Sequence, residues 1–369
     1  MKKLGQALGK TKGIAVLYEY LEKLDKAIDP NHQAESEDLT RRAVAYEPIE
    51  RLPLTINCPA PDWPSFTYQE IFSDKAKMLL SELAPVWVGA NVRDDRVFTV
   101  RANYGVGAIA SMFGCRVHLT EDNTMPWVEH LDDAALDKVL ESGDVNINSG
   151  LGEKVFETQR FYVEVLSQYE KLNRWVHIYL SDTQGPFDNA HLIMGHKIYT
   201  ELYDNPERVH RLLDLVTDTY IRYTRAQKDL VGESGHYSYH SQMIVRGAVR
   251  ICDDSGINLS RELYKEFCKP YNERIFSEFG GGWIHYCGGG QQILPEVLST
   301  KGLTGINFGQ PEFQDLEAVY EAAAPKSIAV LGWIGRERVP RSIKTGITII
   351  DNAPDLQTAK SLMLQHRTR

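Results

Sequence analysis

The sequence of 369 residues has few cysteines, no long hydrophobic run and no cluster of basic residues. Its 5 cysteines are too scattered for a disulfide framework, and their odd number leaves at least one unpaired, which is typical of a reducing compartment. No stretch approaches the roughly 20 apolar residues of a membrane span, and no apolar segment follows the first lysines as in a signal peptide. We therefore expect a cytoplasmic protein that does not contact a membrane.

The charge balance is acidic, with 41 Lys and Arg against 50 Asp and Glu and a net charge of −9. A nucleic-acid-binding protein shows a clustered basic surface, so we expect no nucleic-acid partner. The 6 Trp, 18 Tyr and 12 Phe residues need a folded core to bury them, which excludes a disordered chain. We expect a small-molecule substrate, and a monomer or a homodimer.

Helix and strand patterns alternate along the chain. Apolar residues at three- and four-residue spacing, from Ile14 to Leu24, predict a helix in the first 45 residues. Eight strands are expected after it, at 52–57, near 85–90, and at 175–180, 243–251, 283–287, 303–308, 328–334 and 346–350.

Strands that alternate with helices pair in parallel through crossover connections. Eight of them favour a (β/α)8 barrel over an open sheet, and no GxGxxG motif follows the first strand to indicate a dinucleotide-binding fold. The predicted fold is therefore α/β, a single (β/α)8 TIM barrel at 46–369 with an N-terminal helical extension at 1–45.

The sharpest feature is His285-Tyr286-Cys287, which ends a predicted strand and runs into three glycines. Residues i and i+2 of a strand point to the same face, so the imidazole and the thiol project together. They do so at the strand end where barrel enzymes place catalysis, and they form a zinc-type ligand pair. The alternative is a buried cysteine beside a hydrogen-bonded core histidine.

A second segment, Cys252-Asp253-Asp254, also follows a predicted strand. Adjacent carboxylates repel each other when buried, so one of them needs a partner such as a cation, a substrate proton or a metal. Equally open is the alternative that Asp253 or Asp254 caps the helix expected at 260–279.

Asp182 follows the strand at 175–180 and is placed to point into a barrel mouth. The alternative is a capping loop, because Gly185-Pro186 starts the next helix. Arg246 and Arg250 lie four residues apart on the strand at 243–251, so both are expected to face the same way.

Arg250 is nearest the end of its strand and could hold an anionic group of the substrate with two hydrogen bonds. The alternative is an ion pair with Asp253 or Asp254.

Several of these segments occur together in one known superfamily. In chain order they are Asp182–Pro186, Asp253–Ser260, Phe267–Tyr271 and His285–Gly288. They resemble the uroporphyrinogen decarboxylase superfamily, which includes cobalamin-dependent methyltransferases that methylate thiols such as coenzyme M. The resemblance extends over most of the chain from about residue 40, and it too implies a (β/α)8 barrel.

The decarboxylase branch of this superfamily carries an arginine-rich RQAGRY segment that clamps substrate carboxylates, and nothing in the chain matches it. By resemblance, the tyrosine of the YMxEG stretch falls on His191, and the serine of the DSWAG stretch falls on Asp254. The aspartate of the FSD stretch corresponds to Asp74, and the C-terminal histidine of that branch has no counterpart.

The methyltransferases of the superfamily bind zinc through a His-x-Cys pair and a later cysteine. His285 and Cys287 match the pair, but no cysteine follows Cys287. A third ligand must therefore come from Asp254, Asp182 or Cys252, and zinc accepts carboxylates as well as thiolates.

The leading prediction is zinc-assisted methyl transfer between a corrinoid on a partner protein and a small thiol or methylated metabolite. The alternatives are a metal-independent decarboxylase of a porphyrinogen-like polycarboxylate, and a non-catalytic barrel that binds a tetrapyrrole or a corrinoid protein. The candidate residues are Asp254, Asp182 and Asp74 for catalysis, Arg250, His191, Gln184 and Asn307 for substrate binding, and His285, Cys287 and Asp254 for metal.

Overall fold

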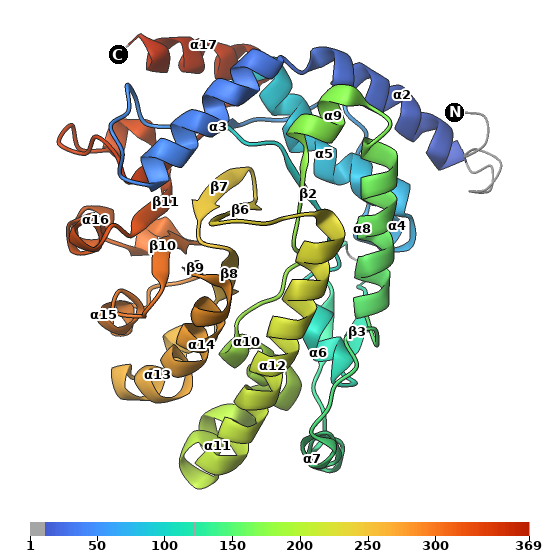
Figure 1. Ribbon diagram of the computed structural model, residues 1–369, viewed down its shortest axis with the longest axis vertical. Helices are drawn as coiled ribbons and strands as arrows, with labels where there is room; N and C mark the ends of the chain where they lie inside the picture. The colour runs from blue at the N-terminus through green and yellow to red at the C-terminus, as the bar shows by residue number, and fades with distance from the viewer. Residues whose placement is uncertain (1–11, 121–122, 369) are drawn as a thin grey trace.

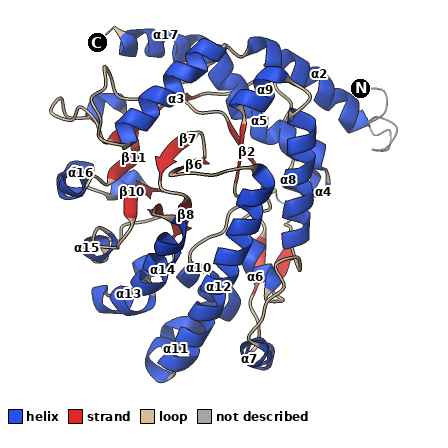
Figure 2. Cartoon of the chain, viewed as in Figure 1, coloured by secondary structure: helices blue, strands red, loops and turns tan. Residues whose placement is uncertain are grey.

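The computed structural model describes residues 12–120 and 123–368, and its centre is a ring of eight short strands surrounded by helices (Figures 1 and 2). In chain order these strands are β1 (Leu54–Asn57), β2 (Thr99–Arg101), β5 (His177–Tyr179), β8 (Val249–Cys252), β9 (Gly282–Tyr286), β10 (Leu303–Phe308), β11 (Ala329–Ile334) and β12 (Ile347–Asn352). Six form one parallel sheet in the order β8-β9-β10-β11-β12-β1, and β2 pairs in parallel with β5. Because the order around the ring follows the chain, the fold is the predicted α/β TIM barrel.

Helices lie before, between and after these strands, and two antiparallel hairpins are added to them. The helices are α2 (Lys12–Ala27), α3 (Pro30–Val44), α4 (Tyr68–Ser73), α5 (Lys75–Val92), α6 (Ala108–Met112), α7 (Asp133–Ser142), α8 (Gly152–Leu166), α9 (Glu170–Trp175), α10 (Pro186–Met194), α11 (Ile198–Asp204), α12 (Pro206–Val231), α13 (Arg261–Phe267), α14 (Lys269–Phe279), α15 (Leu294–Val297), α16 (Leu316–Ala323) and α17 (Leu356–Arg367). The hairpins pair β3 (Arg116–His118) with β4 (Trp127–Glu129), and β6 (Tyr237–His240) with β7 (Met243–Arg246). Among the described residues, no helix is both long enough and apolar enough to cross a membrane.

Two helices precede the barrel. The helix predicted from the apolar spacing is α2, and its Leu17, Leu21 and Leu24 are buried against the main core. Pro30 ends that pattern as the first residue of α3, which Asp29 caps by accepting two backbone N–H groups. We retain the proposal that 1–45 is an extension of the barrel, although 1–11 lie outside the described residues.

The strand expected near 85–90 is wrong, because these residues lie in α5, with Pro85 inside the helix. Val86 and Val88 lie on this helix and are buried in the protein core. A short run of buried β-branched residues has the same sequence pattern in a helix as in a buried strand. The second barrel strand is instead β2, whose three residues are too few to show a periodicity.

The strand expected at 243–251 is two strands, β7 and β8, because Gly247 turns the chain between them with a φ of 93°. A Cβ at this position would lie 2.6 Å from the backbone nitrogen of Gly282, so only glycine fits. Arg246 and Arg250 therefore do not share one strand. Arg246 donates to the carbonyl of Ser327 at 2.7 Å, far from the contacts of Arg250 described below.

The junction between β1 and β2 is closed mainly by side chains, beside one backbone hydrogen bond from Asp95 to Leu54 at 2.9 Å. Asp94 accepts the N–H of Ile56 at 2.7 Å, and Asp95 accepts the N–H of Leu54 at 3.0 Å. Arg96 donates to the carbonyl of Ile56 at 2.6 Å and pairs with Asp94 at 2.7 Å. The side chains of Asp94 and Arg96 are 0% and 1% exposed, so this is a buried and fully engaged ion pair.

Candidate active site at the carboxyl ends of the barrel strands

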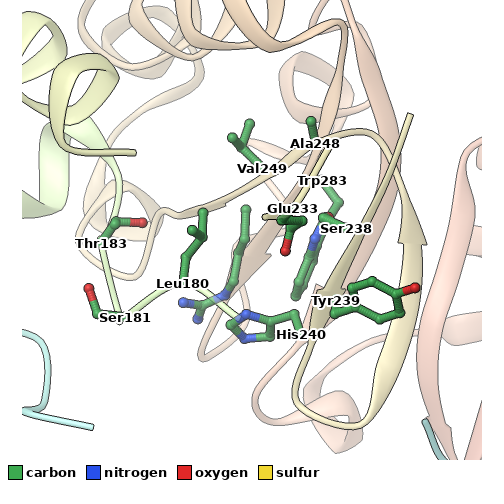
Figure 3. A pocket seen from close by; sticks show the side chains of 11 residues that line it. Leu180, Ser181, Thr183, Glu233, Ser238, Tyr239, His240, Ala248, Val249 and Trp283 are labelled. Atoms are coloured by element: carbon green, nitrogen blue, oxygen red, sulfur yellow. The ribbon is translucent and has the colours of Figure 1, made fainter. Parts of the chain in front are cut away.

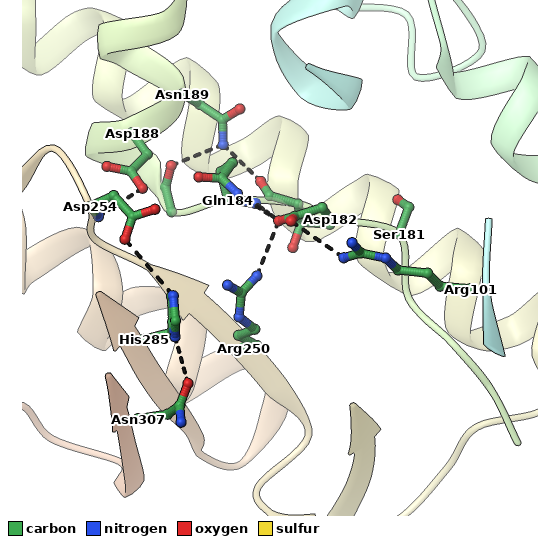
Figure 4. Close-up of polar contacts among 12 residues, drawn as sticks. Arg101, Ser181, Asp182, Gln184, Asp188, Asn189, Arg250, Asp254, His285 and Asn307 are labelled. Atoms are coloured by element: carbon green, nitrogen blue, oxygen red, sulfur yellow. Dashed lines mark hydrogen bonds and ion pairs between the residues drawn. The ribbon is translucent and has the colours of Figure 1, made fainter. Parts of the chain in front are cut away.

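Four groups that can bind a metal lie together at the carboxyl ends of β8 and β9. One ligand atom each from Cys252, Asp254 and His285 lies within 4.8 Å of the other two. The Sγ atom of Cys287 lies 3.6 Å from Nε2 of His285. The strand ends singled out in the sequence therefore form one cluster, of which Figure 4 shows Asp254 and His285.

The ring of His285 is oriented by β10. Its Nδ1 lies 2.6 Å from Oδ1 of Asn307, whose amide nitrogen donates to the carbonyl of Leu331 at 2.8 Å. The bond to Leu331 identifies the amide nitrogen of Asn307, so the atom facing the ring is its oxygen, and the ring must donate from Nδ1. Nε2 then carries a lone pair that points to the cluster, 3.9 Å from Asp254 Oδ1. Burial and the nearby charge of Arg250 lower the pKa of His285, which favours the neutral imidazole that binds metals.

The turn that presents Asp254 is held by Asp188, on α10. Asp188 accepts the N–H of Asp254 at 3.0 Å and the N–H of Ser255 at 2.6 Å. Asp254 in turn accepts the N–H of Cys287 at 2.6 Å, which joins the ends of β8 and β9. Burial and the carboxylates of Asp254 and Asp253 raise the pKa of Asp188, and a cation at the cluster would relieve this crowding of negative charge.

The adjacent carboxylates Asp253 and Asp254 have different surroundings. Asp253 is buried and accepts hydrogen bonds from Tyr264 at 2.5 Å and Asn272 at 2.8 Å, and burial raises its pKa to about 6. The side chain of Asp254 is 39% exposed. Neither caps the following helix, because Ser260 caps α13, so the capping alternative is wrong. Asp254 is therefore the carboxylate of this pair that a ligand can reach.

The two thiols of the cluster differ in exposure. Cys252 is fully buried, which raises its pKa, whereas Cys287 is half-buried and its pKa is raised to about 11 by burial and by Asp254. Gly309 leaves room for the Cys287 sulfur, since a Cβ there would lie 2.4 Å from Sγ. Both thiols hold their protons at neutral pH, and a metal that binds them must release those protons.

A second charged group lies beside the cluster, at the ends of β2, β5 and β8 (Figure 4). Asp182 accepts from Arg250 at 3.1 Å, from Arg101 at 3.4 Å and from Gln184 at 2.6 Å. Burial alone would raise the pKa of Asp182, but Arg250 and Arg101 hold it well below its usual value. The partner of Arg250 is thus Asp182 and not the Asp253-Asp254 pair that the sequence left open.

The barrel interior beside Arg250 is filled, not hollow. The remaining space of about 20 Å³ lies among Trp283, His240 and neighbouring residues, and it has room for about one water molecule (Figure 3). Burial and the charges of Arg250 and Arg101 lower the pKa of His240 well below its usual value. A substrate therefore has to approach the cluster from the mouth of the barrel.

Two of the predicted site residues, Asp74 and His191, lie outside the cluster of metal-binding groups. Asp74 caps α5, where its carboxylate accepts the backbone N–H groups of Ala76 and Lys77. His191, on α10, lies 2.7 Å from Ser255 Oγ and 2.9 Å from His196 Nδ1. It adjoins the turn that carries Asp254 and lies beside the cluster, not in it.

Sequence reasoning missed Arg101 and Asp188. Arg101 ends β2, the strand that the sequence did not reveal. Asp188 lies in the first turn of α10, where an acidic residue is typical of any helix because it offsets the helix dipole. In the sequence, only its closeness to Asp182, which precedes the same helix, could have indicated that Asp188 belongs to the site.

Comparisons with known proteins place the chain in a class. The sequence pattern of the uroporphyrinogen decarboxylase (URO-D) family matches residues 99–233 and 235–335, which are more than half of the chain. The matched part includes the cluster around His285 and the ion pairs of Asp182. The chain therefore belongs to the uroporphyrinogen decarboxylase family.

Individual relatives carry two activities. The methylcobamide:CoM methyltransferase MtbA of Methanosarcina acetivorans is 23% identical over 283 residues, which are 73% of this chain and 74% of that protein. The uroporphyrinogen decarboxylase of Syntrophotalea carbinolica is 31% identical over 104 residues, 27% of this chain and 26% of that protein. A solved methyltransferase from Methanosarcina mazei has a TM-score of 0.63 at 15% identity, over 90% of this chain and 98% of that chain, which supports the barrel fold.

Proposed function

We propose that the chain is a methyltransferase that moves a methyl group between a corrinoid, carried by a partner protein, and a small thiol or methylated metabolite. The observation that carries the proposal is the cluster of Cys252, Asp254, His285 and Cys287 at the barrel mouth. The similarity to a methylcobamide:CoM methyltransferase over most of the chain supports both the reaction and the corrinoid.

The donor set of the cluster fits zinc. Zinc binds nitrogen at about 2.0 Å and sulfur at about 2.3 Å, so two such ligands of a tetrahedral ion lie about 3.5 Å apart. The distance between His285 Nε2 and Cys287 Sγ is 3.6 Å. Asp254 supplies the third ligand that a catalytic zinc needs, and the fully buried Cys252 is the alternative third ligand.

Bound there, zinc would lower the pKa of a substrate thiol and make it a nucleophile at neutral pH. The residues of the chain prepare the site for such an ion. Asn307 keeps the proton of His285 on Nδ1, and Asp188 holds the backbone of Asp254 in place. The positive charge of Arg250 lowers the pKa of His285, which helps to keep that ring neutral.

The metal-independent decarboxylase has less support. In that alternative an aspartate stabilises a protonated pyrrole intermediate, and the family resemblance assigns this role to Asp74. The carboxylate of Asp74 is instead engaged with two backbone N–H groups as a helix cap. The decarboxylase relative also aligns with only 27% of the chain.

The proposal is tested by following the loss of methylcobalamin absorbance in the presence of 2-mercaptoethanol and zinc-loaded protein. We expect the protein to accelerate demethylation and His285→Ala to abolish the acceleration. Cys58→Ser is the control, because Cys58 is also half-buried but lies outside the cluster. If zinc-loaded wild-type protein gives no acceleration with this thiol or with coenzyme M, methyl transfer to thiols is excluded.

A further inference from the structure

One connection of the barrel lacks its α-helix. Every other pair of successive barrel strands in the described chain is joined through at least one α-helix, but β11 and β12 are joined by residues 335–346, whose only helical element is the short 3-10 helix η5 (Arg336–Arg338). The α-helices on either side of this connection in the chain are α16 and α17 (Figure 1). A (β/α)8 barrel covers its strands with an outer ring of helices, so the outer face is less covered here.

A groove of about 690 Å³ lies at this place. Its walls are the 335–346 connection, residues 49–52 before β1 and His366 of α17, and its lining includes the apolar side chains of Ile343 and Ile349. Small-molecule binding sites have volumes of about 300–1,000 Å³, so the groove has the size of such a site.

Two cations of the groove are fixed and neutralised by carboxylates. Arg336 donates to the carbonyl of Leu362 at 2.7 Å, and its Nε lies 3.4 Å from Asp351. Arg51, on the opposite wall, is paired with the buried carboxylate of Asp95. These pairs give the groove rigid walls.

Two further cations, Arg341 and Lys344, are exposed and line the same groove. Within the described part of the chain, neither has an ion-pair or hydrogen-bond partner. Glu50, an acidic residue of the lining, is instead engaged by Arg42 at 3.1 Å. The other acidic residue of the lining, Glu337, lies 3.3 Å from Nε of Arg336. The charges of Arg341 and Lys344 therefore remain unpaired in the groove, in a protein whose net charge is −9.

We propose that this groove binds a small organic polyanion that carries phosphate or several carboxylates. Arg341 and Lys344 supply charge-assisted hydrogen bonds to the anionic groups, and the half-buried side chains of Ile49 and Val339 contact the uncharged part of the ligand. None of the lining residues belongs to the cluster at the barrel mouth, so this site is separate from the one in the proposed function.

The test is calorimetric titration of the wild-type protein with two probes, inorganic pyrophosphate for phosphate ligands and citrate for polycarboxylates. The variant R341Q/K344Q removes the two unpaired charges at exposed positions. The matched control is R222Q/R225Q, which removes two charges from another groove where Arg222 and Arg225 are already paired with Asp144 and Glu278. Thermal unfolding of all three proteins checks that each is folded.

We expect wild-type protein to bind one equivalent of at least one probe, and the probe that binds identifies the class of ligand. R341Q/K344Q should weaken this binding by about tenfold or more, because each lost charge-assisted bond contributes strongly to affinity. The control variant should bind as the wild type does. The proposal is wrong if neither probe binds at millimolar concentration. It is also wrong if both variants weaken binding equally, since the affinity then depends on the net charge of the protein and not on the groove.

Discussion

The two sides of the barrel are held together in different ways. From β8 round to β1 the strands form a continuous parallel ladder of backbone hydrogen bonds, whereas β2 and β5 are three residues each and, among the described strands, pair only with one another. The junction beside β1 depends on Asp94, Asp95 and Arg96, whose side chains bond to the backbone of β1. Charged side chains thus replace the ladder on one side of the barrel.

This difference separates two kinds of charged group. At the β1–β2 junction the charges of Asp94, Asp95 and Arg96 are buried and satisfied by backbone or by a partner, so we interpret these residues as structural. On the ladder side the backbone holds the strands, and the groups at the ends of β8 and β9 contact one another through atoms that can also bind a metal, such as Nε2 of His285. The following predictions test this division.

The largest effect is expected from Asp94→Ala. It removes the acceptor of the Ile56 N–H and leaves the guanidinium of Arg96 buried without its carboxylate. Removing one partner of a buried ion pair costs about 3–5 kcal/mol, so the free energy of unfolding, measured with urea, should fall by that amount.

Its control is Asp38→Ala, which breaks an exposed pair with Arg42 and should cost less than about 1 kcal/mol. Equal losses in the two variants would contradict the structural role of the junction.

A smaller loss is expected from Asp182→Asn, which leaves Arg101 and Arg250 without their shared carboxylate. Because these side chains are partly exposed, we expect a decrease of about 2–3 kcal/mol in the free energy of unfolding at pH 7.

The sign of the pH dependence follows from the lowered pKa of Asp182. The contribution of its carboxylate is fully present above the unfolded value of about 3.9 and is lost as the pH falls through the folded-state pKa. The difference between wild type and Asp182→Asn should therefore shrink below about pH 4. A difference that stays constant through this range would show that charge is not its cause.

Asn307→Ala should change metal binding more than stability. It removes the acceptor that keeps the proton of His285 on Nδ1, and loss of such a partner lowers metal affinity by about 10–100-fold. Competition with a chromogenic zinc chelator measures this affinity. Unchanged affinity would mean that Asn307 does not orient the ring, and it would return this residue to its predicted role in substrate binding.

The sequence revealed the ladder side better than the other side. Strands such as β9 and β10 have five and six residues and end in chemically distinct side chains, so their patterns and the His285-x-Cys287 pair could be found. The three residues of β2 carry no periodicity, which hid both this strand and Arg101. The pairing of Arg250 with Asp182 joins β8 to the connection after β5, and such contacts depend on three-dimensional closure, which local patterns do not encode.

The most direct test of the proposed metal site is the zinc content of protein that has been incubated with zinc and freed of unbound metal by gel filtration. We expect about one zinc per chain for the wild type and for Cys58→Ser, and almost none for His285→Ala and Cys287→Ser, each with the wild-type fold by circular dichroism. Cys252→Ser should retain most of the metal if Asp254 is the third ligand. A wild-type protein that takes up no zinc, or a His285→Ala variant that keeps it, would contradict the proposed metal site.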